Sequence, residues 1–300
     1  MYCPYDVAPL ASLSGARTGA SDTPFGRVYW VVFGPLDGRP VTLLVHGVND
    51  DADTWTPLLS AARASGADLG SLVAVDLPGF GRSRREQAPL DLTRVGDAVL
   101  DVAAGLGAGP LRVVGHSMGA LLVADLALRH PERVASLHLV AGPYYSVLDG
   151  LHRRRGGWAA RRALATYGVL YATARTGRLG ARLTRQVLPT AVGRLLLRGF
   201  VARPGALRRS VLQHLADAQR PESFLGAARN GRRYREGLTL AGVRCPVWAV
   251  FGAADHLVPD VDARRLQDDL PHAQLTRVSA AGHLVHIERP AATWSGLGLR

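Results

Sequence analysis

The stretch LRVVGHSMGALLVADLALRH, residues 111–130, decides the fold, because a β-branched run passes through GHSMG directly into an amphipathic helical pattern. GHSMG, residues 115–119, matches G-x-S-x-G, in which a strand turns so sharply into a helix that the serine is strained and exposed. A surface glycine-serine turn could have the same letters, but it would not need a strand before it and a helix after it. We therefore interpret Ser117 as a candidate nucleophile.

On both sides of this stretch, short β-branched runs alternate with longer helical patterns. This alternation predicts an α/β fold, with a mostly parallel central sheet flanked by helices. The expected strands are 28–33, 41–46, 71–76, 111–115, 134–140, 246–252 and 274–279, and the expected helices include 92–107, 118–130 and 260–270. Because the turn-forming GPLDGRP separates the first two strands, we expect them to form an antiparallel hairpin.

The domain organisation follows from where the alternation stops. Residues 27–142 and 236–300 are predicted to form one core, and residues 143–235, which contain no convincing strand, an inserted helical lid. Residues 1–26 are expected to be an extension with little ordered structure. A hydrophobic content of 47% is ample for a core in a chain of 300 residues, and it excludes a disordered protein.

Basic charge is concentrated in the predicted lid. All 36 basic residues are arginine, and residues 143–235 contain 19 of them against three acidic residues, a net charge of +16. The remaining residues have a net charge of −4. A basic segment can attract an anionic substrate, an anionic membrane or a nucleic acid. The preferred interpretation is that apolar helix faces cover the active site and arginine faces water. No nucleic-acid-binding module is recognised, so no such partner is expected, whereas weak association with an anionic membrane surface stays open.

Targeting and cysteine signals are weak. Cys3 and Cys245 cannot form a disulfide framework and lack the spacing of metal ligands. No leader-like start and no apolar run of about 18 residues are recognised. We expect a cytoplasmic protein that uses neither a metal nor a cofactor.

A serine nucleophile requires a base, a carboxylate that orients the base, and donors for the oxyanion. Asp255 follows one expected strand by a few residues, and His283 follows the next strand in the same manner. Since the carboxyl ends of parallel strands share one edge of the sheet, these side chains are expected to meet Ser117 there. The chain order serine, aspartate, histidine is one of the orders known for such a triad.

Each of these two residues has rivals nearby. Asp260 or Asp262 could replace Asp255, but both belong to a helix that is expected to point elsewhere. His286 and His256 compete with His283, which is favoured because it directly follows a glycine. A further acidic cluster, Asp50, Asp51 and Asp53, lacks the ordered spacing of a metal site and is interpreted as loop and N-cap residues.

The oxyanion donors are expected at the end of the strand 41–46. There Gly47 lets the backbone turn its amides toward a site, so the amides of Val48 and Met118 are the expected donors. His46, Gly47 and His116 are predicted to belong to the substrate-binding wall.

Together these motifs resemble the α/β-hydrolase fold family, in particular its lid-bearing esterases and lipases. The resemblance spans roughly residues 27–290 and is carried by HG at 46–47, VDLPGFGRS at 75–83, GHSMG at 115–119, FGAAD at 251–255 and AAGH at 280–283. It implies that Ser117 is the nucleophile, that His283 is the general base and then the acid, and that Asp255 holds the imidazole. Asp76 and His116 occupy familiar family positions that look architectural.

The implied reaction is cleavage of a carboxylic ester in a small acyl substrate through an acyl-enzyme, without a cofactor. The family's haloalkane dehalogenases and epoxide hydrolases place aspartate where this chain has Ser117, which argues against both. The same triad also serves C–C bond hydrolases, thioesterases, lactonases and perhydrolases, so these alternatives stay open. A hydrolase-fold protein that binds a ligand without turnover is a further alternative.

Overall fold

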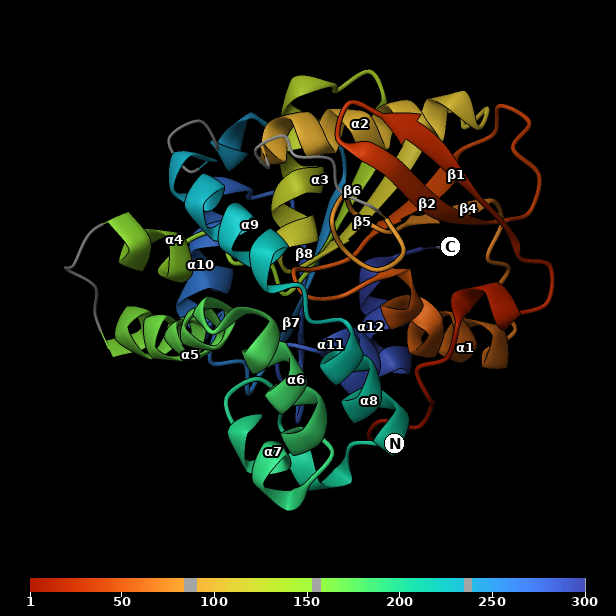
Figure 1. Ribbon diagram of the computed structural model, residues 1–300. Helices are drawn as coiled ribbons and strands as arrows, with labels where there is room; N and C mark the ends of the chain where they lie inside the picture. Colours follow the sequence, from red (N-terminus) through yellow and green to blue (C-terminus); the bar gives the residue numbers. More distant parts are fainter. Residues whose placement is uncertain (84–90, 153–157, 235–238, 300) are drawn as a thin grey trace.

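An eight-stranded sheet forms the centre of the protein, in a computed structural model that describes residues 1–83, 91–152, 158–234 and 239–299 (Figure 1). The strand order is β1-β2-β4-β3-β5-β6-β7-β8; the last six strands are parallel to one another, and β1 and β2 are antiparallel to their neighbours. The strands are β1 Arg17–Thr23, β2 Gly26–Phe33, β3 Val41–Val45, β4 Leu72–Val75, β5 Leu111–His116, β6 Val134–Val140, β7 Val247–Gly252 and β8 Gln274–Val278. The predicted α/β fold class is confirmed.

Helices cover both faces of the sheet. The strand β3 is buried along its whole length. Its consecutive residues Leu43 and Leu44 point to opposite faces of the sheet and belong to the two different apolar clusters there. One face is covered by α2 Leu92–Gly105, α3 Met118–Arg129 and α10 Asp260–Asp269. The other face is covered by α1 Thr56–Ala64, α11 Val285–Glu288 and α12 Pro290–Leu297.

Between β6 and β7 the chain forms a run of helices, which we call the helical segment. It contains α4 Ser146–His152, α5 Trp158–Arg175, α6 Gly177–Val187, α7 Ala191–Leu196, α8 Arg209–Asp217 and α9 Pro221–Tyr234. Residues 143–235 were predicted as a helical insertion; the boundary at 235 lies outside the described residues. Within the described part of the chain, no helix has both the length and the apolar composition needed to span a membrane.

The hairpin expected between the first two predicted strands is wrong. The strand β4 lies between β2 and β3: Val75 is opposite Trp30 in an antiparallel pair and opposite Val45 in a parallel pair. The turn-forming residues 34–40 therefore lead from one strand to another that is not its neighbour. A glycine- and proline-rich stretch ends a strand, but it does not determine which strands pair.

The expectation of a poorly ordered start is also wrong. β1 pairs with β2 in an antiparallel hairpin that runs from the pair Arg17 and Val32 to the pair Thr23 and Gly26. Before it, Leu10 is fully buried. The sequence of β1, RTGASDT, has no alternation of apolar residues because this edge strand is largely solvated, so no strand pattern is visible there.

Candidate active site

Ser117 occupies the sharp turn between β5 and α3, with φ of 53° and ψ of −119°. This backbone conformation is strained for a residue with a side chain. A Cβ atom at Gly115 would lie 2.4 Å from the carbonyl oxygen of Gly119, and one at Gly119 would lie 2.3 Å from the carbonyl oxygen of Val45. Only glycine fits these two positions, which is the physical reason for the G-x-S-x-G spacing. The Ser117 amide donates to the Val140 carbonyl at 2.9 Å and ties the turn to β6.

The structure brings Ser117, His283 and Asp255 together. Ser117 Oγ lies 2.9 Å from His283 Nε2, and His283 Nδ1 lies 2.8 Å from Asp255 Oδ2. All three side chains are buried. The other carboxylate oxygen of Asp255 accepts hydrogen bonds from the amides of Leu257 at 2.7 Å and Val258 at 3.0 Å. Because a carboxylate accepts, His283 Nδ1 is the donor, and Nε2 is left to accept the hydroxyl proton of Ser117.

Glu288 holds the loop that carries His283, and the sequence analysis did not identify it. Its fully buried carboxylate accepts from the Gly282 amide at 2.9 Å, the Ala202 amide at 2.8 Å and the Tyr2 hydroxyl at 2.9 Å. Burial raises the pKa of Glu288 to about 6, against the lowering effect of these hydrogen bonds. These donors are far apart in the chain, so no local pattern indicates the contact.

The two rival acids lie in other environments. Asp262 is buried and accepts from the Ser146 amide at 3.0 Å. Burial raises the pKa of Asp262 to about 6. Asp260 forms a surface ion pair with Arg277. Neither makes the contact with His283 that Asp255 makes.

The rival histidines also have other partners. His286 is fully buried and lies 2.9 Å from Thr54 Oγ1, and burial lowers its pKa to about 4. His256 contacts Arg162 of α5. The structure therefore places neither imidazole against Ser117.

The two expected oxyanion donors lie beside Ser117. Val48 and Met118 line the same cavity as Ser117. Met118 is the first residue of α3, where an amide has no acceptor within the helix and the helix dipole favours negative charge. A Cβ atom at Gly47 would lie 3.0 Å from the Cβ of Ser117, so the loop before Val48 packs closely against the serine.

The three predicted wall residues have different positions. His116 lines the cavity, and its Nε2 donates to the His283 carbonyl at 3.0 Å. Burial holds the pKa of His116 well below its usual range, so this imidazole is neutral. His46 bonds the Gly47 carbonyl and the Leu77 amide, at 2.6 and 2.9 Å. Among the described residues, the cavity lining includes neither His46 nor Gly47. Both residues lie at the start of the loop after β3, and the two hydrogen bonds of His46 hold this loop in place.

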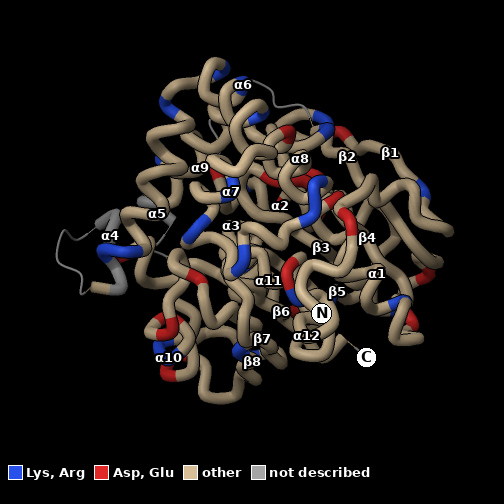
Figure 2. Tube along the Cα trace, turned by 90° about the horizontal axis from the view of Figure 1, so that it is seen from below, with Lys and Arg blue, Asp and Glu red and all other residues tan. Residues whose placement is uncertain are grey.

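The cavity in front of Ser117 has a volume of about 590 Å³. The sheet side and the helical segment both line it, and most lining residues are apolar; those of the helical segment include Tyr167, Leu170, Val187, Leu188, Leu197 and Phe224. Within the described part of the chain, no arginine lines the cavity, although basic positions recur along the helices around it (Figure 2). The cavity therefore suits an uncharged, apolar group.

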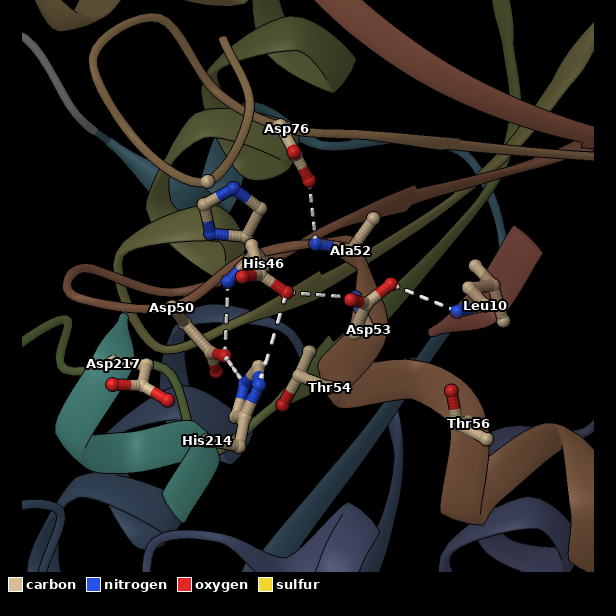
Figure 3. A network of polar contacts seen from close by, with 12 residues as sticks. Leu10, His46, Asp50, Ala52, Asp53, Thr54, Thr56, Asp76, His214 and Asp217 are labelled. Atoms are coloured by element: carbon tan, nitrogen blue, oxygen red, sulfur yellow. Dashed lines mark hydrogen bonds and ion pairs between the residues drawn. The ribbon is translucent and has the colours of Figure 1, made fainter. Parts of the chain in front are cut away.

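Asp50 is the acidic residue among the described residues that line this cavity. It belongs to a network of polar contacts (Figure 3). Its buried Oδ1 accepts from His214 Nε2 of α8 at 2.6 Å, so an ion pair joins the loop after β3 to the helical segment. Burial alone would lower the pKa of His214, but the hydrogen bond and charge of Asp50 raise it to about 9. The interpretation of the acidic cluster as loop and N-cap residues describes Asp51, which caps the helical turn 52–55, but it missed the role of Asp50.

Metal-like spacing occurs twice around Asp50. The ligand atoms of Asp50, His116 and His286 lie within 4.8 Å of one another, and so do those of Asp50, Asp51 and His214. In both groups the Asp50 carboxylate already accepts from His214, and His286 Nε2 already bonds Thr54. The geometry favours a hydrogen-bonded network, and we derive no metal-dependent step from it.

Residues 40–290 match the family model of the α/β-hydrolase fold, and the chain belongs to this family. It is 30% identical over 265 residues to the dihydrolipoyllysine-residue acetyltransferase component of an acetoin cleaving system from Pseudomonas putida. That alignment covers 86% of this chain and 62% of the relative, so the chain spans under two thirds of that protein.

One further relative and one solved structure match over most of both chains. The chain is 28% identical to a protein of Enterobacter cloacae named as the carbamate hydrolase RutD, over 85% of this chain and 89% of the relative. The crystal structure of naproxen esterase from Bacillus subtilis superposes with a TM-score of 0.65 at 19% identity, over 93% of this chain and 89% of that one. By sequence the chain is thus similar to an acetyltransferase component and to a protein named as a hydrolase, and its likeness to naproxen esterase is one of fold.

Proposed function

We propose that the protein is a serine hydrolase that cleaves an uncharged carboxylic ester through an acyl-enzyme. The observation that carries the proposal is the contact of 2.9 Å between Ser117 Oγ and His283 Nε2, with Asp255 bonded to the far side of the imidazole. This contact lies at the wall of an apolar cavity. These two contacts support the assignment of Ser117 as nucleophile, His283 as base and Asp255 as the carboxylate that orients the base.

In the acylation step, Ser117 Oγ attacks the ester carbonyl carbon while its proton passes to His283 Nε2. The carbonyl oxygen becomes an oxyanion, and the amides of Val48 and Met118 stabilise it. Asp255 stabilises the imidazolium. When the intermediate collapses, the bond to the leaving alcohol breaks, and His283 returns the proton to that alcohol.

In the deacylation step, His283 takes a proton from a water molecule that attacks the acyl carbon. When the second tetrahedral intermediate collapses, the bond between Ser117 Oγ and the acyl carbon breaks, His283 returns its proton to Ser117 Oγ, and the carboxylic acid leaves. The substrate class follows from the cavity, whose apolar lining favours a neutral acyl group over a carboxylated one. Relatives named as hydrolases and an esterase among the similar structures support the reaction class.

The proposal is tested by labelling with a fluorophosphonate probe and by hydrolysis of p-nitrophenyl esters of increasing chain length. We expect Ser117→Ala to abolish labelling and to lower kcat by about 10⁴-fold or more. The matched control is Ser12→Ala on the exposed surface, which should leave both unchanged. Labelling that persists without Ser117 would refute the site. Ligand binding without turnover of esters, thioesters or lactones would indicate a binding protein instead.

A further inference from the structure

The helical segment exposes large apolar side chains. Beyond Met1, the described large apolar side chains that are at least half exposed all fall within residues 158–196. We call six of them the apolar rim: Val169, Leu179, Leu183, Val192, Leu195 and Leu196. Large exposed apolar patches mark sites of interaction with proteins or membranes.

The apolar rim is continuous with the cavity of the candidate active site. Val169 of α5, Leu183 of α6 and Leu196 of α7 are each more than half exposed and also line that cavity. A side chain can do both only where the cavity reaches the surface. The mouth of the cavity therefore lies between α5, α6 and α7.

Arginine flanks the rim, most regularly on α6. At helical spacing, Arg178, Arg182 and Arg185 fall on one side of α6, and Leu179 and Leu183 lie on the adjacent side. The three arginines are exposed, and so are both leucines. An amphipathic helix with leucine beside arginine is the pattern of helices that lie in the interface of an anionic membrane. Exposed Arg175 and Arg198 extend the basic surface beyond α6.

We propose that the apolar rim and its arginines dock on an anionic lipid bilayer, with the cavity mouth facing the membrane. The leucines enter the boundary between head groups and acyl chains, while the guanidinium groups bind lipid phosphates. An apolar ester then passes from the lipid phase to Ser117 without crossing water. This last step rests on the function proposed above; the docking itself does not.

Charge selects this occupant among the alternatives. The segment 143–235 has a net charge of +16, so a second copy of the chain placed on the rim would bring like charges together. Duplex nucleic acid would neutralise the arginines but would leave the leucines between them facing a phosphate backbone. An anionic bilayer satisfies both the charge and the exposed apolar side chains.

The docking is tested in the Ser117→Ala background, so that catalysis plays no part. Co-sedimentation is measured with phosphatidylglycerol vesicles and with phosphatidylcholine vesicles. We expect the protein to bind the phosphatidylglycerol vesicles at least tenfold more tightly than the phosphatidylcholine vesicles. The binding to the anionic vesicles should weaken at high salt. Arg178→Gln with Arg182→Gln should lower the partition coefficient by about 25-fold, or about fivefold for each arginine. The matched control is Arg27→Gln with Arg244→Gln, two exposed arginines outside the helical segment, which should stay close to the unsubstituted background.

The apolar contribution is tested by Leu179→Ser with Leu195→Ser, because neither residue lines the cavity. We expect vesicle binding to fall on the order of tenfold, since each leucine loses its burial in the bilayer. In the otherwise wild-type enzyme, the same pair should slow hydrolysis of a vesicle-borne ester and leave a water-soluble ester unaffected.

Several outcomes would overturn the docking. These are equal binding to both vesicle types, variants at the rim that behave like the control, a stable dimer that the leucine substitutions dissociate, or tighter binding to duplex DNA than to vesicles. Vesicle binding of the expected pattern, with no ester hydrolysis by the wild type, would support the docking and refute the proposed function.

Discussion

The sheet edge buries polar side chains, whereas the helical segment exposes large apolar ones. At the sheet edge, polar side chains such as Asp255 and His283 are buried and each has a defined partner. In the helical segment, leucines such as Leu179 are exposed, and arginines such as Arg178 face solvent. The comparison teaches that buried polar side chains with defined partners belong to the part that would do the chemistry, and exposed apolar side chains to the part that lines the mouth of the cavity.

The largest expected effect separates two buried aspartates, one at the sheet edge and one beside the helical segment. Asp255→Asn should lower kcat by about 10⁴-fold, because an amide can donate to His283 Nδ1 and so favours the wrong tautomer. Asp262→Asn, whose carboxyl bonds Ser146, should change kcat by less than about tenfold. Steady-state kinetics on one soluble ester checks both. If Asp262→Asn lowered kcat as much as Asp255→Asn, the prediction that only Asp255 acts on His283 would be wrong.

The next effect concerns the ion pair that joins the two regions. His214 has a folded-state pKa of about 9 beside Asp50, against about 6.5 in an unfolded chain. The protonation of His214 therefore contributes about 3 kcal/mol to the free energy of unfolding below about pH 6.5. This contribution is lost as the pH rises through about 9. Urea unfolding at a series of pH values should show this decline in the wild type.

His214→Gln should reduce that decline of the unfolding free energy between pH 6.5 and 9. His272→Gln is the matched control, because this exposed histidine lies outside both the ion pair and the cavity. An equal pH dependence in wild type and His214→Gln would mean that the pair contributes nothing to folding.

The last prediction contrasts two helical glycines. Gly119→Ala in α3 should destabilise the protein by about 3 kcal/mol, because its Cβ would lie 2.3 Å from the Val45 carbonyl oxygen and the backbone must move. Gly168→Ala in α5, where no described atom beyond the adjacent residues and backbone of its own helix lies within 4 Å of the new Cβ, should stabilise it by about 0.5–1 kcal/mol. Thermal unfolding of both variants measures the opposite signs. If both substitutions shifted Tm in one direction, the packing contrast would be refuted.

Most strands of the sheet could be located from the sequence because the inner parallel strands, such as β3 and β4, are short apolar runs that are buried on both faces. The strand β1 could not be located, since an edge strand with solvated faces has no apolar alternation. The strand order could not be predicted either. It depends on the position of β4 between β2 and β3, and the sequence of the turn 34–40 contains no sign of that position.

At the candidate site, the sequence identified the residues that follow strands, because the carboxyl ends of parallel strands share one edge. Ser117, Asp255 and His283 could be named for that reason. The pair of Asp50 and His214 could not, because 164 positions separate the two residues and neither lies in a motif that names the other. The same holds for Glu288, whose partners come from three distant parts of the chain.

The carboxylate and the backbone carbonyl of Glu288 link residues 2 and 3 to the loop that carries His283. Tyr2 reaches this carboxylate through its hydroxyl, and the adjacent Cys3 amide donates to the Glu288 carbonyl at 2.8 Å. Trimming the amino terminus, or fusing a bulky tag to it, would thus disturb the support of the imidazole loop from more than 280 positions away.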